Sequence, residues 1–425
     1  MLYLSRHLYR RGRLSSHTPA HQPVSESLTV AKGRDRAWPL WPVVPIYPYG
    51  RRRTLKREII PGKLWLFEQV QGIFYVIVPI RMTVIKLAGG GLMAFSPVAP
   101  TRECVRMMRE LEAEHGEVKY VILPTVTGVE HKYFAGPFAQ KFKRSQVYVA
   151  PNQWSFPLDL PMSWLGFPAK RTHVLPAEAS QTPFFDEFDY AIVGPIDLSI
   201  KPYTEVAFFH RETRSLLAID TILSIPIEPP VVVEQDPFPL LFHARDSAQD
   251  PLIDSLENRR KGWARIALFT FYFQPQKLDV PTLKQVLKDA AQSPDRSKKN
   301  YFGLYPFYWQ SGWYDSFEKL RDGGRLLVAP ILQTLIFNRG PEAVLAWADR
   351  IAQWDFKQVI PAHFSAPVEA TPADFRRAFD FLTRPNLQSW SGFEHDVPMG
   401  DLETLGQIDL RLRGEVLPPP KNKAE

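Results

Sequence analysis

Four side chains of metal-binding type lie at the ends of short β-rich runs. Glu130 and His131 end the run VILPTVTGVEH, Asp220 lies in LLAIDT, and His363 lies in QVIPAHF. Two imidazoles and two carboxylates suit Zn²⁺, Mn²⁺ or Fe²⁺. The set predicts one bound divalent metal ion, which would acidify a water molecule for attack on an ester, thioester or phosphoester bond. In that hypothesis Asp220 orients the water.

The same residues also have a structural interpretation. A lone histidine is commonly a hydrogen-bonded structural residue, and an aspartate after a strand commonly caps a turn. His131, Asp220 and His363 could therefore brace their loops by hydrogen bonds as a fossil metal site. The protein would then be a non-catalytic binding or assembly protein for a small molecule or a protein partner.

Aromatic residues are concentrated in a later segment that would serve a binding protein. Between residues 263 and 314 the chain carries Trp263, Tyr305, Phe307, Tyr308, Trp309, Trp313 and Tyr314. Such rings stack on a flat ligand, or they form a hydrophobic lid over the segment. The sequence leaves both alternatives open.

The elements before the first pair of ligands alternate between strands and helices. The run from residue 74 to residue 98 predicts an antiparallel start. Thr101 predicts the N-cap of a helix that ends at His115 and Gly116, and the buried strand VKYVILP follows. A second helix and the strand SQVYVAP come next, which predicts parallel pairing. Because carboxyl ends of strands converge on one crevice, we expect the four residues to meet.

Further along the chain, residues 205–221 read as a hairpin in which the turn RETR joins EVAFFH to SLLAIDT. Residues 230–325 are irregular and predict an insertion. A helix opened by Pro341, the strand KQVIPAHF and a helix opened by Thr371 and Pro372 complete the pattern. The overall prediction is an α/β fold.

The order of these motifs resembles the metallo-β-lactamase superfamily, in which an LTHxHxDH loop, a strand ending in GD and a strand ending in PGH follow one another. The resemblance implies a four-layer αββα sandwich. It also places Val126 and Gly128 at the first two histidines of the loop, and it finds no histidine near residues 202–204 for the third. The resemblance therefore implies that the first metal site is lost.

The second metal site of the superfamily keeps a candidate at every position, with Glu130 in place of an aspartate beside His131, Asp220 and His363. This resemblance implies a degenerate site for a single ion. A neighbouring cation would have to replace the missing ion, and the candidates are Lys132, His210, Arg211, His243 and Arg245.

A closer resemblance connects the chain to the family called domain of unknown function 4336, which occurs in cyanobacteria and photosynthetic eukaryotes. It covers residues 38–382 and rests on WPLWPVVPIYPYGRRRTLKREIIPG, PIRMTVIKL, SPVAPT, YVAPNQWSFPLDLP, LLFHARD and VAPILQTLIFNR. It implies a cytoplasmic protein in a cyanobacterium or a plastid protein in a photosynthetic eukaryote, and it brings no activity with it.

Composition predicts the domain boundaries and excludes several classes of protein. We expect a leader over residues 1–37, a proline-rich and aromatic arm over 38–62, the main domain over 63–385 and a C-terminal tail over 386–425. The first 60 residues hold twelve Lys or Arg against three acids, which predicts a basic arm. The first twenty residues, with four arginines and no acid, fit an organelle transit peptide.

Other exclusions follow from single residues. Cys104 is the only cysteine, so neither an internal disulfide nor a cysteine-rich zinc site is expected. Charged residues interrupt the longest apolar stretch, from Leu64 to Leu87, so no transmembrane segment is expected. Relatives of the resembled superfamily that cut RNA need the complete histidine loop, which binds two metal ions. That loop is incomplete here, so nucleic acid is not expected as a partner.

Overall fold

The computed structural model describes residues 33–40, 42, 45–126, 130–155, 159–198, 201–386 and 389–414. These described residues form one compact unit by their internal contacts. Apart from residues 33–37, the expected leader lies outside the described residues.

A seven-stranded sheet begins the described part of the chain, with its strands in sequence order. Its strands are β1 (Leu55–Ile60), β2 (Leu64–Ile73), β3 (Val76–Lys86), β4 (Leu92–Phe95), β5 (Val118–Leu123), β6 (Gln146–Val149) and β7 (Thr172–Val174). Strands β1 to β4 pair antiparallel and β4 to β7 pair parallel. The antiparallel start and the parallel continuation are confirmed.

A five-stranded sheet has the order β14-β13-β10-β9-β8. Its strands are β8 (Phe188–Ile196), β9 (Tyr203–His210), β10 (Ser215–Ala218), β13 (Gln358–Pro361) and β14 (Val368–Glu369). The antiparallel hairpin of β9 and β10 confirms the sequence prediction. Strand β13 pairs parallel to β10, with Ala218 opposite Pro361.

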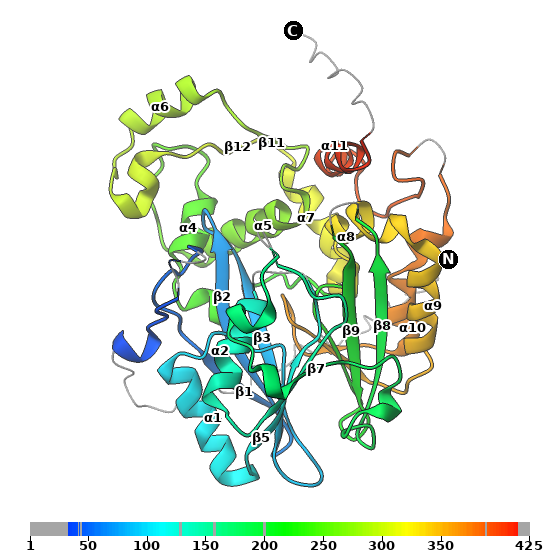
Figure 1. Cartoon of the computed structure of the whole chain (residues 1–425). Helices are drawn as coiled ribbons and strands as arrows, with labels where there is room; N and C mark the ends of the chain where they lie inside the picture. Colours follow the sequence, from blue (N-terminus) through cyan, green and yellow to red (C-terminus); the bar gives the residue numbers. More distant parts are fainter. Residues whose placement is uncertain are drawn as a thin grey trace, which may run out of the picture. The chain divides into compact units, whose positions relative to one another are not determined.

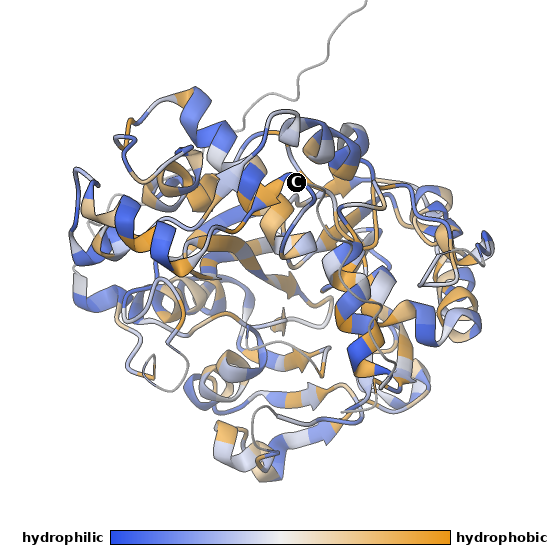
Figure 2. Cartoon of the chain, turned by 90° about the horizontal axis from the view of Figure 1, so that it is seen from above, coloured by the Kyte–Doolittle hydropathy of each residue, from blue (hydrophilic) through white to orange (hydrophobic). Residues whose placement is uncertain are grey.

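Neighbouring residues of the strands point to opposite faces and so divide the core into layers. Phe208 and Leu217 belong to the core between the two sheets, whereas Phe209 and Leu216 belong to the core on the outer face of the second sheet. Figure 2 shows mostly hydrophobic strands between helices that also carry hydrophilic residues.

Helices cover the outer face of each sheet and complete the four layers (Figure 1). α1 (Arg102–His115) and α2 (Lys132–Lys141) supply side chains to the core on the first sheet. The second sheet is covered by α5 (Leu256–Tyr272), α8 (Pro330–Leu335), α9 (Pro341–Ile351) and α10 (Pro372–Arg377). The fold is therefore the expected α/β, four-layer αββα sandwich.

Helix boundaries follow the capping signals of the sequence. The Thr101 side chain accepts a hydrogen bond from the Cys104 N–H, and Gly116 ends α1 with a φ of 95°. Thr371 and Asp374 form a capping box at α10. Both predicted helix starts are confirmed.

The segment 230–325 contains several helices and a small sheet. These elements are α3 (Val231–Glu234), α4 (Phe238–Ala244), α6 (Leu283–Ala291), α7 (Trp313–Arg321), β11 (Leu278–Asp279) and β12 (Tyr308–Trp309), in addition to α5. Trp263 of α5 is fully buried in the core on the second sheet. Part of this segment therefore belongs to the sandwich itself.

Both ends of the described chain pack on this body. Strand β1, within the expected arm, pairs with β2. α11 (Glu403–Leu412), within the expected tail, buries Leu405 and Asp409 completely. The domain boundaries stay predictions. Among the residues that the structure describes, no helix is long and apolar enough to cross a membrane.

Candidate functional site

Parallel pairing of β10 and β13 brings two of the candidate residues together. Asp220 and His363 each follow the end of their strand by two residues, and the strand ends lie side by side. His363 Nε2 lies 3.0 Å from Asp220 Oδ1. The sequence expectation that strand ends would converge is confirmed for this pair.

The loop after β5 approaches the same place because it is bonded to the second sheet. The Val126 N–H donates to the Thr204 carbonyl at 3.1 Å, and the Val206 N–H donates to the Pro124 carbonyl at 2.7 Å. His131 then forms the N-cap of α2. Its ring centroid lies 5.9 Å from that of His363.

Backbone carbonyls fix the orientation of both imidazole rings. His131 Nδ1 lies 3.2 Å from the Pro97 carbonyl oxygen, and His363 Nδ1 lies 3.0 Å from that of Pro79. Since a carbonyl only accepts, each Nδ1 carries the proton. His131 Nε2 is buried and has no hydrogen-bond partner among the described residues. A lone pair is therefore available at His131 Nε2.

The two histidines have opposite electrostatic environments. Burial, together with the neighbouring His363, lowers the pKa of His131 to about 4. For His363 burial opposes protonation, but the hydrogen bond and charge of Asp220 raise the pKa. The pKa of Asp220 is lowered, because His363 outweighs the effect of burial. These pKa shifts favour a charged His363 beside an ionised Asp220, and a neutral His131.

Glu130 connects this cluster with a cavity. Burial raises the pKa of Glu130, and the charge of Asp220 raises it further against the opposing effects of His363 and of a hydrogen bond from Gln71. Glu130 and Gln71 both line the cavity. A carboxyl with a raised pKa retains its proton more readily and then donates a hydrogen bond.

Glu205 holds the Asp220 loop and was not singled out by the sequence analysis. Its buried carboxylate accepts the N–H groups of Ile219, Asp220 and Thr221 at 3.0 to 3.3 Å, and the hydroxyls of Thr221 and Tyr203 at 2.7 and 2.8 Å. A charged residue in the apolar run EVAFFH was the available signal.

A second buried carboxylate fixes the His363 loop through an arginine. Arg81 donates to the carbonyls of Pro361 and Phe364, at 2.5 and 2.8 Å, and lies 2.7 Å from Glu68. Glu68 also pairs with Arg57 at 2.8 Å. Glu68 and Arg81 are two of the charged residues that interrupt the apolar stretch from Leu64 to Leu87. Charged residues inside buried strands are unusual, so Glu68 and Arg81 were the available sequence signal for this positioning role.

The four candidate side chains are of types that bind a divalent cation, but the distances between them are not those of a formed metal site. In the described ranges, no group of three or more His, Cys, Asp or Glu side chains is arranged to hold a metal ion. His131 has the Nδ1 anchor and free Nε2 that metal-bound histidines commonly have. His363 would first lose its Nε2 proton, because only a neutral imidazole binds metal. Metal binding at Glu130, His131, Asp220 and His363 stays a prediction.

The five candidate cations contact other parts of the molecule. Lys132 donates to the carbonyls of Val126 and Trp154, and burial lowers its pKa to about 8. Arg211 pairs with Asp189 at 2.7 Å.

The remaining three lie against neutral partners. His210 Nδ1 lies 2.7 Å from Thr213 Oγ1, His243 Nε2 lies 3.1 Å from the Phe74 carbonyl, and Arg245 lies over the rings of Phe242 and Tyr305. These contacts give no support to the idea that one of the three residues replaces the missing ion.

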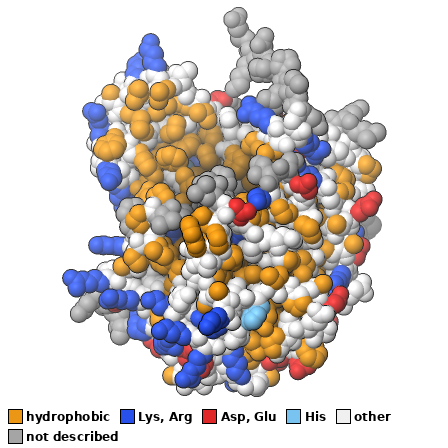
Figure 3. All heavy atoms as spheres, viewed as in Figure 1, with side chains coloured by type: hydrophobic (Ala, Val, Ile, Leu, Met, Phe, Trp, Pro, Cys, Tyr) orange, Lys and Arg blue, Asp and Glu red, His pale blue; other side chains and the backbone are white. Residues whose placement is uncertain are grey.

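The cavity beside Glu130 has a volume of about 1010 Å³ and a largely apolar wall. The wall comes from the tip of the β2–β3 hairpin, from α4, α5, α6 and α11, and from residues 301–307. No Lys, Arg, His or Asp is among its described lining residues. Figure 3 shows hydrophobic side chains gathered around a hollow on this side of the protein. A pocket of this kind suits an apolar small molecule.

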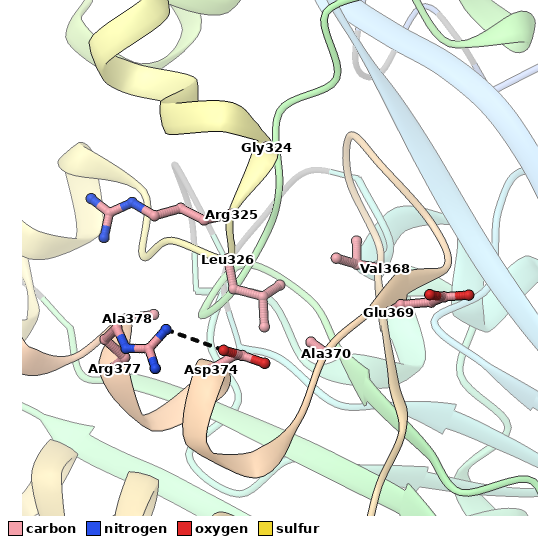
Figure 4. A pocket seen from close by; sticks show the side chains of 9 residues that line it. All are labelled: Gly324, Arg325, Leu326, Val368, Glu369, Ala370, Asp374, Arg377 and Ala378. Carbon is pink, nitrogen blue, oxygen red and sulfur yellow. Dashed lines mark hydrogen bonds and ion pairs between the residues drawn. The ribbon is translucent and has the colours of Figure 1, made fainter. Parts of the chain in front are cut away.

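A smaller cleft of about 160 Å³ lies between residues 324–326 and α10. Two of its charged residues are paired with each other: Figure 4 shows Arg377 directed at Asp374, and the two lie 3.2 Å apart. Asp374 also belongs to the capping box of α10. The capping box and the ion pair account for the position of Asp374 without a ligand, so the apolar cavity is the better candidate site.

The aromatic segment contributes mainly to packing. Tyr305 and Phe307 are buried, and the Arg265 guanidinium lies over the rings of Trp309 and Trp313 at 5.2 and 4.7 Å. The lid alternative therefore accounts for most of these rings. Phe307 also lines the cavity.

Comparison with protein families decides the family of the chain. Residues 61–381 match the family described as Domain of unknown function (DUF4336). The chain belongs to this family. The matched residues include Glu130, His131, Asp220 and His363, together with nearly all of the cavity wall.

Known structures and curated proteins add no activity to this assignment. The chain is similar to a metal-soaked flavodiiron core from Synechocystis sp., with 11% identity and a TM-score of 0.38 over 79% of this chain and 62% of that one. It is also similar to a metallo-β-lactamase from Hirschia baltica, with 8% identity and a TM-score of 0.34 over 79% and 99%. The chain thus spans less than two thirds of the flavodiiron chain. No curated protein matches the sequence.

Proposed function

We propose that this protein binds an apolar small molecule in the cavity beside Glu130. The proposal rests on the cavity of about 1010 Å³, whose wall is almost entirely apolar. Transfer of an apolar molecule from water into such a space is favourable in proportion to the apolar area removed from water. The volume is at the upper end of the usual range for small-molecule sites, about 300 to 1,000 Å³.

Polar groups at one wall would recognise a neutral head group. The Gln71 amide can donate a hydrogen bond, and the raised pKa of Glu130 favours its protonated form, which would donate as well. A carboxylate ligand would find no described Lys or Arg on the wall and would face the charge of nearby Asp220. An uncharged ester, ketone or alcohol fits this chemistry better.

Two substitutions at Thr270 test the cavity. Thr270 lies half-buried on α5 and lines the cavity. We expect Thr270→Trp to fill part of the space and to weaken the binding of the neutral apolar dye Nile red about tenfold or more. Fluorescence titration measures the affinity.

Thr270→Val is the matched control, because it removes the hydroxyl but keeps the space. It should bind Nile red as the unmodified protein does. If Thr270→Trp binds the dye equally well, or the unmodified protein does not bind it, the proposed cavity site is wrong.

A second candidate function is hydrolysis of an ester, thioester or phosphoester assisted by one divalent metal ion. The unpartnered Nε2 of buried His131 favours it, together with the contact between Asp220 and His363. Glu130, His131, Asp220 and His363 would hold the ion, which when bound would supply a water molecule of lowered pKa. The cavity would hold the apolar part of the substrate.

Elemental analysis tests this second candidate without an activity assay. After incubation with Zn²⁺, Mn²⁺ or Fe²⁺ and desalting, we expect about one equivalent of one metal in the unmodified protein and less than about 0.1 equivalent in His131→Ala/His363→Ala. His210→Ala/His243→Ala is the matched control and should retain the metal. Equal metal contents in all three proteins would exclude this site.

A further inference from the structure

Large hydrophobic side chains are exposed at the mouth of the cavity. Ile73 is 60% exposed, Phe74 62%, Phe273 40%, Val280 57% and Leu283 73%, and all five line the cavity. Exposed apolar patches of this kind usually mark a binding surface.

Two further residues enlarge the patch. Leu287 lies one helical turn after Leu283 on α6 and is 55% exposed, and Phe302 is 61% exposed. Phe302 follows Tyr301, whose ring centroid lies 5.5 Å from that of Phe74. We call these seven exposed residues the cavity rim.

The cavity rim is accompanied by basic residues. Residues 277–302 hold six Lys or Arg and three Asp. Five of the basic residues are exposed and form no ion pair with another described residue: Lys284, Lys288, Arg296, Lys298 and Lys299. Lys284 and Lys288 lie on α6, where Leu283 and Leu287 are their sequence neighbours. Figure 3 shows Lys and Arg side chains bordering the hydrophobic area.

We propose that the cavity rim docks on the surface of an anionic lipid membrane. Apolar side chains that enter the boundary between head groups and acyl chains lose their contact with water, and Lys or Arg beside them attract anionic head groups. This surface combines both features. The cavity opens within it, so an apolar molecule could pass between the membrane and the cavity without crossing water.

Charge and cavity favour a membrane over a protein partner. The core of a protein interface is depleted of charged residues, whereas on α6 the leucines and lysines are adjacent in sequence. No described helix spans a membrane, so the attachment would be peripheral. Docking needs no occupied cavity, and it can therefore be tested apart from the proposed ligand binding.

Sedimentation of the full chain with vesicles tests the proposal. We expect binding to phosphatidylcholine vesicles that contain about 30% phosphatidylglycerol, and much weaker binding to pure phosphatidylcholine. Leu283→Ser/Leu287→Ser should lower the partition coefficient about tenfold or more. Lys284→Gln/Lys288→Gln should lower it about tenfold at low salt, and salt should remove most of that difference.

Matched substitutions outside the cavity rim provide the controls. Trp164→Ser changes a residue that is 76% exposed and does not line the cavity, and Lys143→Gln/Lys170→Gln removes two other exposed charges. Both variants should bind vesicles as the unmodified protein does. The docking surface is wrong if the unmodified protein does not bind anionic vesicles, or if the controls lose as much binding as the rim variants.

A protein interface would give a different result. The unmodified chain would then self-associate with increasing concentration and ignore vesicles, and Leu283→Ser/Leu287→Ser would abolish the self-association. That outcome also overturns membrane docking.

Discussion

Two buried glutamates near the candidate site, Glu205 and Glu68, show how neighbouring charges shift the pKa of a carboxyl group. Burial and the charge of Asp220 raise the pKa of Glu205, although hydrogen bonds from Thr221 and Tyr203 oppose this. Burial also disfavours the charge of Glu68, but Arg81 and Arg57 lower its pKa to about 2. Opposite charges at hydrogen-bond distance outweigh desolvation for Glu68 alone. Each carboxyl orders one of the two loops that carry Asp220 and His363.

Replacement of Glu205 by alanine tests the ordering of the Asp220 loop. The change leaves three backbone N–H groups and two hydroxyls without their acceptor in a buried place. We expect the free energy of unfolding to fall by about 3 kcal/mol in urea titrations. Glu212→Ala, which removes an exposed pair with Lys63, should change it by less than about 1 kcal/mol. Similar losses in the two variants would contradict the role of Glu205.

At the scale of elements, local signals in the sequence were sufficient for much of the sandwich. Thr101 and the capping box at Thr371 mark helix starts through contacts within four residues, so they can be recognised in the sequence. Asp220 and His363 were expected to meet because the carboxyl ends of strands converge, and they lie 3.0 Å apart. Glu205 and Arg81 were missed as site residues, since their partners lie far away in the sequence.

The ion pairs of Glu68 on β2 with Arg81 on β3 and Arg57 on β1 predict a dependence of stability on pH. The pKa of Glu68 is about 2 in the folded protein, below its value of about 4.3 in an unfolded chain. Its stabilising contribution is therefore present above about pH 4.3 and is lost as the pH falls toward 2. Glu68→Gln, which leaves Arg81 buried without its counter-ion, should lower the free energy of unfolding by about 3 to 5 kcal/mol at neutral pH.

Urea titrations at several pH values measure how the ion pair between Glu68 and Arg81 contributes to the free energy of unfolding. The difference in unfolding free energy between the unmodified protein and Glu68→Gln should decrease between about pH 5 and about pH 2. Lys63→Gln, which breaks the exposed pair with Glu212, is the control and should change little at any pH. A difference for Glu68→Gln that is independent of pH would contradict the linkage.

For the whole molecule, the cavity depends on segments that are distant in the sequence. Its wall runs from Ile46 to Thr404 and includes the hairpin tip of β2 and β3. No periodicity or motif indicates such a space, because it exists only after these segments pack. The segment 230–325 contributes most of the described wall, and its α5 also supports the sandwich core. A cytoplasmic or plastid location remains a prediction from sequence.

Shortening the chain tests whether residues after 385 belong to the folded body. Leu402 and Leu405 are completely buried, and Asp409 pairs with Arg339 at 2.7 Å. Because a chain that ends at Pro385 loses these contacts, we expect its free energy of unfolding to fall by at least about 4 kcal/mol. It should also bind Nile red more weakly, since Thr404 lines the cavity. A chain that ends at Gly414 keeps α11 and is the control. Equal stability and dye affinity in the two shortened chains would identify residues 386–414 as a dispensable tail.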